Sequence, residues 1–543
     1  MNSNGKYRRN LCRFLCVALA ATTSATLLAQ SKYHRDLPDY DQRRNALPAD
    51  GGMFCVPTAY VNILRFMALN GLGNLDQGYN NTYNSITSFI SNMGNRMDTD
   101  AQDGTNFSDG YDAVLDWIDD HSNQGYMHIA CVSDGDWGTG TIKNWMAVGA
   151  MVRLGYGRYK KVDGEWERNG GHAISMSGYD YSGSTKYIDY ANPASDDGNI
   201  NAQGAFTYDK KTVKNVHYDS DDDGWVTHAQ LSSGTNAKTC FIDNMHAILP
   251  LWGGWFSVPH TEVQDQIQWA TIAADFYVPS GLAASTFHAV FPGAPGTAAR
   301  EIEVEVPGTV KDWCFDVRDV GIYVLSDDGT ITHIDLVEKE SKRIASVKGA
   351  RKLAVAGKKF DLFVLQDGAA QDNLVRVEPA TGTQTSLKVA KGITAIEPDQ
   401  ETLGIAALHP GEKKIFRIDP LLRRVSPVSV DVPEGDGAVM VAVGRKGEFT
   451  LARGRTFTRA TRRVVLAQAP KIRAFQAVGK DRFLLQDGSK LTMVDADGKT
   501  IPGAFDGVTA SGTFRAAHSW KAFTRADVSG PKWRDVLPAS GDM

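Results

Sequence analysis

Cysteine is scarce in this sequence, which has six cysteines among 543 residues. Two of them lie in an N-terminal segment that we expect to be removed, so four remain for the folded protein: Cys55, Cys131, Cys240 and Cys314. So few cysteines in a chain of this length exclude a fold that depends on disulfide bonds. One bridge, between Cys131 and Cys240, stays open, and it would leave Cys55 and Cys314 as free thiols.

The chain also lacks a large excess of either charge. Its 58 Lys and Arg residues against 63 Asp and Glu residues give a formal net charge of −5 at pH 7. This balance gives no electrostatic case for binding nucleic acid or an anionic membrane surface. Zinc-ligand spacing, a phosphate-binding loop and a dinucleotide fingerprint are absent from the sequence as well. We therefore expect no nucleic-acid partner and no required cofactor.

The N-terminus has the three parts of a secretory signal. Basic residues between Lys6 and Arg13 precede a short apolar run over residues 14–21, and small residues follow up to Ala29. The apolar run is too short for a transmembrane helix. We therefore expect residues 1–29 to be a signal peptide, the mature protein to be secreted or periplasmic, and no stable membrane span to remain after cleavage.

The rest of the chain is too long for one hydrophobic core, and its patterns change near residues 155 and 278. Residues 51–155 have mainly helical periodicity, and short alternating strands begin at Tyr156. Helices followed by an antiparallel sheet predict an α+β domain over residues 30–277. Residues 278–300 are rich in Pro, Gly and Ala and are expected to be a linker.

The C-terminal half repeats itself at intervals of about 35 to 45 residues. Each unit has an apolar strand, a turn with glycine and a second strand that ends in an acidic residue, as in residues 322–335 and 482–495. Such units over residues 301–525 predict an all-β, propeller-like domain, with a β-sandwich as the alternative, and a tail over residues 526–543. By analogy of fold, we expect a protein or glycan partner on this domain.

The most informative segment surrounds Cys55. Apolar positions recur with a helical period up to Met67, and Asn70-Gly71 would end the helix. Pro57 fits only the first turn of a helix, so the helix is expected to begin at about Cys55. A thiol at that position is close to the positive end of the helix dipole, which favours the nucleophilic thiolate. The alternative is a small buried residue at a helix start.

A cysteine nucleophile needs a base within hydrogen-bond reach and a residue that orients the base. His172 follows two glycines at the start of a predicted strand, and a short turn joins this strand to the next one. Paired residue numbers in an antiparallel hairpin have a nearly constant sum, which places Asn192 opposite His172. Asp189 is the second choice as the orienting residue. Alone, His172 would be interpreted as structural; together with Asn192 and Cys55 it is predicted to be catalytic.

These motifs together resemble the papain-like cysteine peptidase superfamily. A Cys-X-Pro-Thr-Ala helix start at Cys55, a later Gly-His strand that ends in Gly-Tyr-Asp, and a following strand that ends in Asn-Pro are similar to the branch of double-glycine, bacteriocin-leader-processing peptidases. The resemblance covers about residues 35–250. It implies that Cys55 is the nucleophile, His172 the general base and acid, and Asn192 the orienting residue.

The resemblance also implies an oxyanion hole made of the Cys55 backbone N–H and a glutamine side chain. The family has glycine after the nucleophile, where this chain has Val56, and its glutamine lies a few residues before the cysteine, where this chain has Ala49. Gln42 is the nearest glutamine upstream, so we expect it to complete the oxyanion hole through a loop lengthened around residues 48–52. Asn45 is the substitute candidate.

A separate acidic pattern comprises Asp219, Asp221, Asp223 and Gly224. Carboxylates at alternate positions followed by glycine are typical of a calcium-binding loop. The twelfth position of such a loop is Gln230 instead of glutamate, and no helical pattern flanks it. An acidic hairpin turn is the alternative. If an ion binds, we expect calcium in a structural role.

Together these features predict an exported cysteine peptidase that hydrolyses peptide or peptide-like amide bonds through a Cys-His-Asn triad and a thioester acyl-enzyme. The expected partner is a peptide or protein substrate outside the cytoplasm. Two alternatives stay open. One is acyl transfer of the transglutaminase or amidase type on the same triad, and the other is a non-catalytic binding protein that uses the propeller-like domain.

Overall fold

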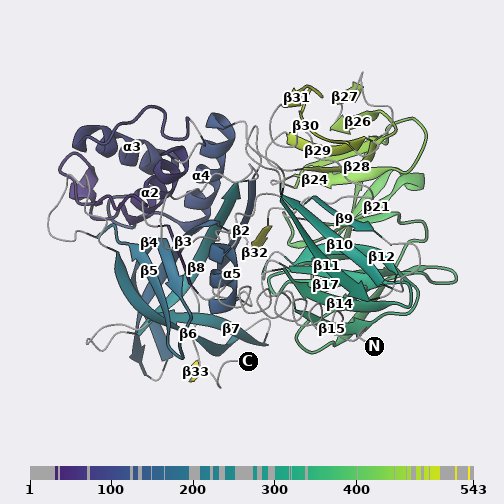
Figure 1. Ribbon diagram of the computed structural model, residues 1–543, viewed down its shortest axis with the longest axis horizontal. Coiled ribbons are helices and arrows are strands. Elements are labelled where there is room, and N and C mark those ends of the chain that lie inside the picture. The colour runs from purple at the N-terminus through teal and green to yellow at the C-terminus, as the bar shows by residue number, and fades with distance from the viewer. Residues whose placement is uncertain are drawn as a thin grey trace, which may run out of the picture.

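The computed structural model describes residues 31–194 and 208–250 with short gaps, three strands between residues 273 and 307, residues 309–501 with short gaps, and two short C-terminal strands. The predicted signal peptide, residues 1–29, lies outside the described residues. The described chain is mostly β-structure, with its α-helices in the N-terminal half (Figure 1). Of the helices described, none is both long and apolar enough to cross a membrane.

The described α-helices are α2 (Cys55–Leu69), α3 (Tyr83–Arg96), α4 (Phe107–His121) and α5 (Thr139–Ala147). Helix α2 begins at Cys55, as predicted, because Pro57 fits its first turn. Thr82 caps α3 by accepting a hydrogen bond from the Ser85 N–H. The helical region expected up to residue 155 ends earlier in the structure, since a strand already begins at Met151.

The strands of the N-terminal half form one large sheet: β1 (Ser31–Tyr33), β2 (Tyr126–Val132), β3 (Met151–Val162), β4 (Glu165–Asp180), β5 (Lys186–Ala191), β6 (Asp209–Ser220), β7 (Gly224–Leu231) and β8 (Thr239–Pro250). Strands β3 to β8 pair in succession, and β8 also pairs with β3, so these six strands close into an antiparallel ring. The Ser175 hydroxyl donates to the Ala59 carbonyl at 2.7 Å, which ties β4 to α2. Strand β4, which carries His172, and helix α2, which begins at Cys55, are therefore held together.

The C-terminal half is a series of small antiparallel sheets. The first has three strands: β9 (Ala273–Tyr277), β10 (Ala284–Phe291) and β11 (Arg300–Pro307). Five four-stranded sheets follow: β12 (Val310–Asp316), β13 (Gly321–Ser326), β14 (Thr330–Asp335) and β15 (Ser341–Ser346); β16 (Ala350–Ala356), β17 (Asp361–Gln366), β18 (Asp372–Val377) and β19 (Gln384–Val389); β20 (Ala395–Asp399), β21 (Gly404–His409), β22 (Lys414–Ile418) and β23 (Val425–Ser429); β24 (Met440–Val443), β25 (Phe449–Arg453), β26 (Thr456–Arg459) and β27 (Arg462–Val465); β28 (Ile472–Ala477), β29 (Arg482–Asp487), β30 (Lys490–Asp495) and β31 (Thr500–Ile501). The predicted all-β, propeller-like character of this half is confirmed.

The structure differs from the expected domain boundaries at two places. Residues 278–300, expected as a linker, include β10 and the start of β11. Two short strands near the C-terminus return to the N-terminal sheet: β32 (Trp520–Ala522) pairs in parallel with β2, and β33 (Val536–Pro538) pairs with β6. Residues 520–522 were expected in the propeller-like domain and residues 536–538 in a free tail. Strands of three residues are too short to show a periodic pattern, so the sequence could not reveal them.

The two halves pack directly against each other (Figure 1). One continuous cluster of buried side chains runs from Trp145 and Ile174 in the N-terminal half to Trp313 in the first four-stranded sheet. At a second contact, the Arg482 side chain of β29 donates to the carbonyl oxygens of Asp119, at 3.1 Å, and Ser122 at the end of α4. The propeller-like half thereby supports α4.

The four cysteines in the described chain form no disulfide bond, so the bridge considered between Cys131 and Cys240 is wrong. The pairing of β2 with β8 places Cys131 opposite Met245, whereas Cys240 lies at the other end of β8 opposite Leu231. Burial raises the pKa of the Cys131 thiol well above its usual value, so this cysteine is an inert core residue.

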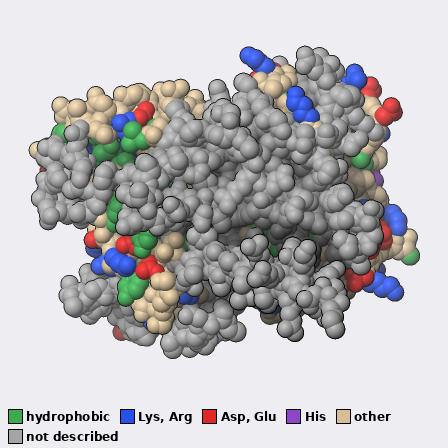
Figure 2. All heavy atoms as spheres, in the orientation of Figure 1, with side chains coloured by type: hydrophobic (Ala, Val, Ile, Leu, Met, Phe, Trp, Pro, Cys, Tyr) green, Lys and Arg blue, Asp and Glu red, His purple; other side chains and the backbone are tan. Residues whose placement is uncertain are grey.

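One face of the molecule is shown in Figure 2, where the coloured Lys and Arg side chains are interspersed with Asp and Glu side chains. This distribution agrees with the small net charge of −5. It does not identify a partner for the propeller-like half, so the expected protein or glycan partner stays a prediction.

Candidate active site

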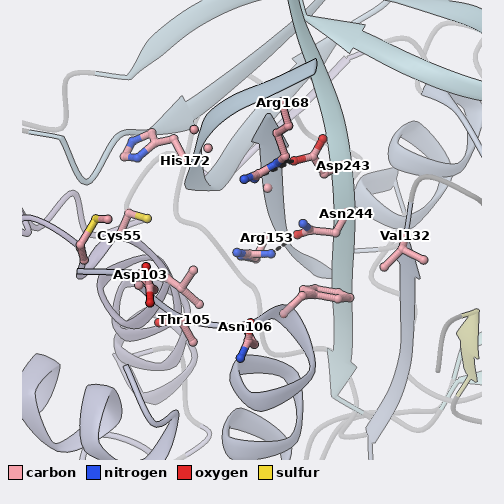
Figure 3. Close-up of a pocket in the computed structure, with 17 residues that line it drawn as sticks. Cys55, Asp103, Thr105, Asn106, Val132, Arg153, Arg168, His172, Asp243 and Asn244 are labelled. Atoms are coloured by element: carbon pink, nitrogen blue, oxygen red, sulfur yellow. Dashed lines mark hydrogen bonds and ion pairs between the residues drawn. The ribbon is translucent and has the colours of Figure 1, made fainter. Parts of the chain in front are cut away.

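Cys55 is the first residue of α2, and its half-buried thiol lines a pocket in the N-terminal half (Figure 3). The ring of Phe54, just before it, is buried against Gly94 of α3, where any larger side chain would overlap the ring. A short helical turn, Pro48–Gly51, precedes Phe54 in the chain. The packing of Phe54 against α3 holds the start of α2 in place.

Cys55 and His172 line the same pocket, and His172 contacts Asn192. Burial raises the pKa of the Cys55 thiol, and His172 on β4 is the neighbour that opposes this effect most. His172 Nε2 lies 2.7 Å from Asn192 Oδ1, so Nδ1 is the ring nitrogen left for the thiol. Asn192 is itself held in place, because its amide donates to Asp209 at 2.9 Å and its oxygen accepts the Ala194 N–H at 3.2 Å.

The structure brings His172 and Asn192 together although the register between β4 and β5 is not the one predicted. Ser175 pairs with Ala191, and Gly178 pairs with Asp189, with a bulge between these two pairs. Asn192 lies just past the end of β5 and reaches His172 from there. Asp189, the second choice, lies opposite Gly178, so it is not the residue that orients His172.

The surroundings of Cys55 favour its thiolate. Burial alone raises the pKa of this thiol, but the hydrogen bond and charge of His172 oppose it, together with the Ala173 N–H and the charge of Arg153. The net result is a pKa below the usual value of 9.0. A lowered thiol pKa is the electrostatic signature of a reactive cysteine.

Gln42 is beside the Cys55 loop, as expected, but its amide hydrogens have other partners. Its Nε2 donates to the carbonyls of Gly51, at 3.0 Å, and Gly52, at 2.9 Å. The Gln42 N–H also donates to the Pro193 carbonyl at 2.8 Å, next to Asn192. In this arrangement Gln42 holds the loop before Cys55 instead of presenting a donor to a bound carbonyl. Asn45, the substitute candidate, is exposed on the same loop.

Val56 departs from the family pattern, and the structure shows how its side chain fits. The side chain is buried against Gly110 in the first turns of α4, where a Cβ would lie 3.0 Å from Val56 Cγ1. Because Gly110 has no side chain, the Val56 side chain has room beside α4. Val56 is compatible with an intact pocket.

The pocket has a volume of about 290 Å³. Its walls come from the start of α2, the loop before α4, and strands β2, β3, β4 and β8. Beside Cys55 and His172, it is lined by charged and amide side chains that the sequence patterns did not single out: Asp103, Asn106, Arg153, Arg168, Asp243 and Asn244 (Figure 3). No local motif marks these residues, because each sits in an ordinary strand or loop pattern.

The predicted calcium loop is only partly within the described chain. Asp219 lies on β6, with its backbone paired to Trp225 of β7, and Asp221 and Asp223 are outside the described residues. Within the described residues, no three His, Cys, Asp or Glu side chains are grouped to hold a metal ion. The calcium site stays a prediction.

We expect Gly51→Ala to weaken the support of the Cys55 helix. Gly51 has a φ of 74°, and a Cβ would overlap the Gln42 carbonyl oxygen. Gly78 has nearly the same φ, 76°, with no atom within 4 Å of an added Cβ, so Gly78→Ala isolates the backbone effect. The free energy of unfolding in urea should fall by about 2–4 kcal/mol for Gly51→Ala and about 1 kcal/mol for Gly78→Ala. Equal losses would show that the contact with Gln42 relaxes freely.

Comparisons with known proteins do not assign this chain to a family. No protein-family model matches it, and no curated protein matches it. A protein of unknown function from Bacteroides caccae is 12% identical over 44% of this chain and 97% of its own, with a TM-score of 0.32. An oligogalacturonate lyase in complex with manganese is 12% identical (43% and 85% covered, TM-score 0.28), and the nidogen/laminin complex is 10% identical (46% and 96% covered, TM-score 0.34). Likenesses this weak carry no argument about function, so function is argued from the site.

Proposed function

We propose that this protein is a cysteine peptidase with a papain-like N-terminal domain, which hydrolyses peptide or peptide-like amide bonds. The observation that carries the proposal is that Cys55 and His172 line the same pocket and that His172 Nε2 lies 2.7 Å from Asn192 Oδ1. Nucleophile, base and orienting residue in this order are what acyl transfer by a cysteine requires.

The surrounding fold supports the papain-like assignment. The nucleophile stands at the N-terminus of a helix, the base stands on β4, and its partner directly follows the adjacent antiparallel strand β5 of the closed ring. The apolar core between α2, α3, α4 and the sheet holds these parts in fixed relation. Such rigid positioning is needed because catalysis depends on the geometry of the reacting atoms.

The proposed reaction proceeds in two half-reactions. The Cys55 thiolate attacks the amide carbonyl carbon, and the tetrahedral oxyanion forms near the N-terminal N–H groups of α2, which have no acceptor within the helix. The C–N bond then breaks as protonated His172 donates its proton to the leaving amine, which leaves a thioester on Cys55. In the second half-reaction His172 takes a proton from water, the hydroxyl adds to the thioester carbonyl, and the carboxylic acid leaves as the thiol is restored.

We propose that the substrate is a peptide or protein outside the cytoplasm, because residues 1–29 are predicted to be a signal peptide. The propeller-like half is proposed to provide a binding face for a protein or glycan. Its direct packing against the N-terminal half would keep such a partner close to the pocket-bearing domain.

The test is cleavage of a peptide mixture in water labelled with heavy oxygen, with Cys55→Ala beside the wild type. We expect wild-type protein to produce new C-termini that carry the label, and the variant to produce none. Added methylamine distinguishes the competing activity, because new methylamide ends without the oxygen label would show acyl transfer instead of hydrolysis. Absence of new ends in every peptide pool, with the variant equal to wild type, would overturn the proposal in favour of a binding protein.

A further inference from the structure

The pocket beside Cys55 contains a buried cation, Arg153, near the start of β3. Arg153 is 3% exposed and lines the pocket. Its guanidinium lies over the rings of Tyr60, at 5.7 Å, and Phe107, at 5.4 Å, and its Nη1 donates to Asn244 Oδ1. Its Nε is buried and has no hydrogen-bond partner among the described residues. The guanidinium is thus held in place by rings and one amide, with donor capacity left over.

Arg153 has no carboxylate partner among the described residues, in contrast to its neighbour Arg168. Arg168 pairs with Asp243 through Nε and Nη2, both at 2.9 Å, and the Tyr159 hydroxyl donates to the other Asp243 oxygen at 2.7 Å. The Asp243 carboxylate is therefore already occupied. Asp103, the other acidic group lining the pocket, is exposed. The charge of Asp243 reaches Arg153, but its oxygens are bonded to Arg168 and Tyr159, so Arg153 makes no direct ion pair among the described residues. A buried guanidinium without a direct ion pair is costly, and an anionic ligand would reduce that cost.

The backbone around Arg153 leaves space for these side chains. An added Cβ at Gly155 would overlap the Asn244 amide, and one at Gly157 would lie 2.7 Å from both Asp243 oxygens. On β4, a Cβ at Gly171 would overlap the Arg168 guanidinium. Three glycines on adjacent strands thus allow polar side chains to lie along the pocket wall. This arrangement is a formed subsite, in which the amide of Asn244 holds Arg153.

We propose that Arg153 binds a carboxylate of the substrate, in a subsite next to the amide that Cys55 attacks. The position of the subsite relative to the reacting bond rests on the proposed function, whereas carboxylate binding itself does not. A guanidinium binds a carboxylate through two parallel hydrogen bonds, and these are strong in a desolvated pocket. The substrates are therefore peptides with either an acidic side chain or a free C-terminal carboxylate beside the scissile bond.

The test measures binding to the Cys55→Ala protein, which cannot turn a substrate over. The probes are two matched pairs: N-acetylglutamate methylamide with N-acetylglutamine methylamide, and N-acetylglycylalanine with its methylamide. We expect the carboxylate of one pair to bind at least about tenfold more tightly than its neutral partner, and the preference to disappear in Arg153→Gln. The pair that shows the preference identifies the source of the carboxylate.

The controls keep this test separate from the test of the peptidase reaction. Lys160→Gln removes a positive charge from an exposed position on the same strand and should leave the preference unchanged. If Arg153→Gln does not fold, the comparison within each pair of probes on the Cys55→Ala protein still decides.

No preference for the carboxylate in either pair, or a preference that survives in folded Arg153→Gln, would overturn the proposal. So would an equal loss of turnover for charged and neutral substrates in Arg153→Gln, because that result assigns Arg153 to the oxyanion. A protein that binds carboxylates through Arg153 but cleaves nothing would overturn the peptidase reaction and leave the subsite standing.

Discussion

Replacing His172 with alanine is expected to slow the reaction of Cys55 with a thiol-directed peptidyl electrophile by about 10²–10⁴-fold at pH 7. The thiolate is the reactive form, and His172 supplies two of the influences that favour it, a hydrogen bond and a charge. Burial of the thiol, the largest influence, acts in the opposite direction and persists in the variant. Removing His172 therefore leaves burial opposed only by the Ala173 N–H and by Arg153.

The pH dependence of the rate of Cys55 modification shows in which direction His172 shifts the pKa of Cys55. The rate of modification rises as the pH passes through the pKa of Cys55, which in the wild type lies below 9.0. In His172→Ala the pKa of Cys55 rises, so the inflection moves to higher pH and the two profiles converge only in alkaline solution. Mass spectrometry of the modified peptides measures both rates as a function of pH.

Cys240 provides an internal control for this measurement. It lies half-buried on β8 in the same chain and forms no disulfide bond, so its modification is a reference rate for the reagent. His172→Gln, which keeps more of the side-chain volume against Tyr156, guards against a simple packing effect. If Cys55 reacts as slowly as Cys240 in the wild type, in His172→Ala and in His172→Gln, a catalytic role for His172 is contradicted.

The local parts of the site could be predicted from the sequence because their signals are local. Pro57 defines the start of α2, and the short turn between β4 and β5 brings Asn192 to His172. The predicted register was wrong because the turn between the strands is centred later in the chain than expected: Asp180 pairs with Tyr187, and the bulge between Met176 and Gly178 shifts the pairing back by only one position. The contact between His172 and Asn192 still forms, because Asn192 reaches His172 from just beyond the end of β5.

The rest of the pocket could not be predicted, for a different reason. Arg153, Asp243 and Asn244 come from strands far apart in the sequence, and only the pairing of β3 with β8 brings them together. Long-range pairing of this kind leaves no periodic pattern in either strand. The direction of the Gln42 amide likewise depends on a loop in which Ala49 and Asp50 have positive φ angles, a conformation that is rare for residues other than glycine.

The second large effect is expected at Asn192. Its Oδ1 accepts the Nε2–H of His172 at 2.7 Å, and this contact keeps Nδ1 facing the thiol. Asn192→Ala removes the acceptor and leaves the imidazole free to rotate. A displacement of the base by about 1 Å can cost roughly 10²-fold in rate, so we expect a loss of that order in the modification of Cys55 at pH 7.

Asn192 is a positioning residue, so its test needs a readout that a loss of stability would not move. The inflection in the pH profile of Cys55 modification should shift upward, between the wild-type position and that of His172→Ala, because the ring is still present but no longer fixed beside the thiol. Asp189→Asn is the matched control on β5, three residues before Asn192. Asp189 pairs with Gly178, away from His172, so its variant should keep the wild-type profile. If Asp189→Asn shifts the inflection and Asn192→Ala does not, the orienting role of Asn192 is wrong, since only the residue that holds Nε2 can change how His172 meets the thiol.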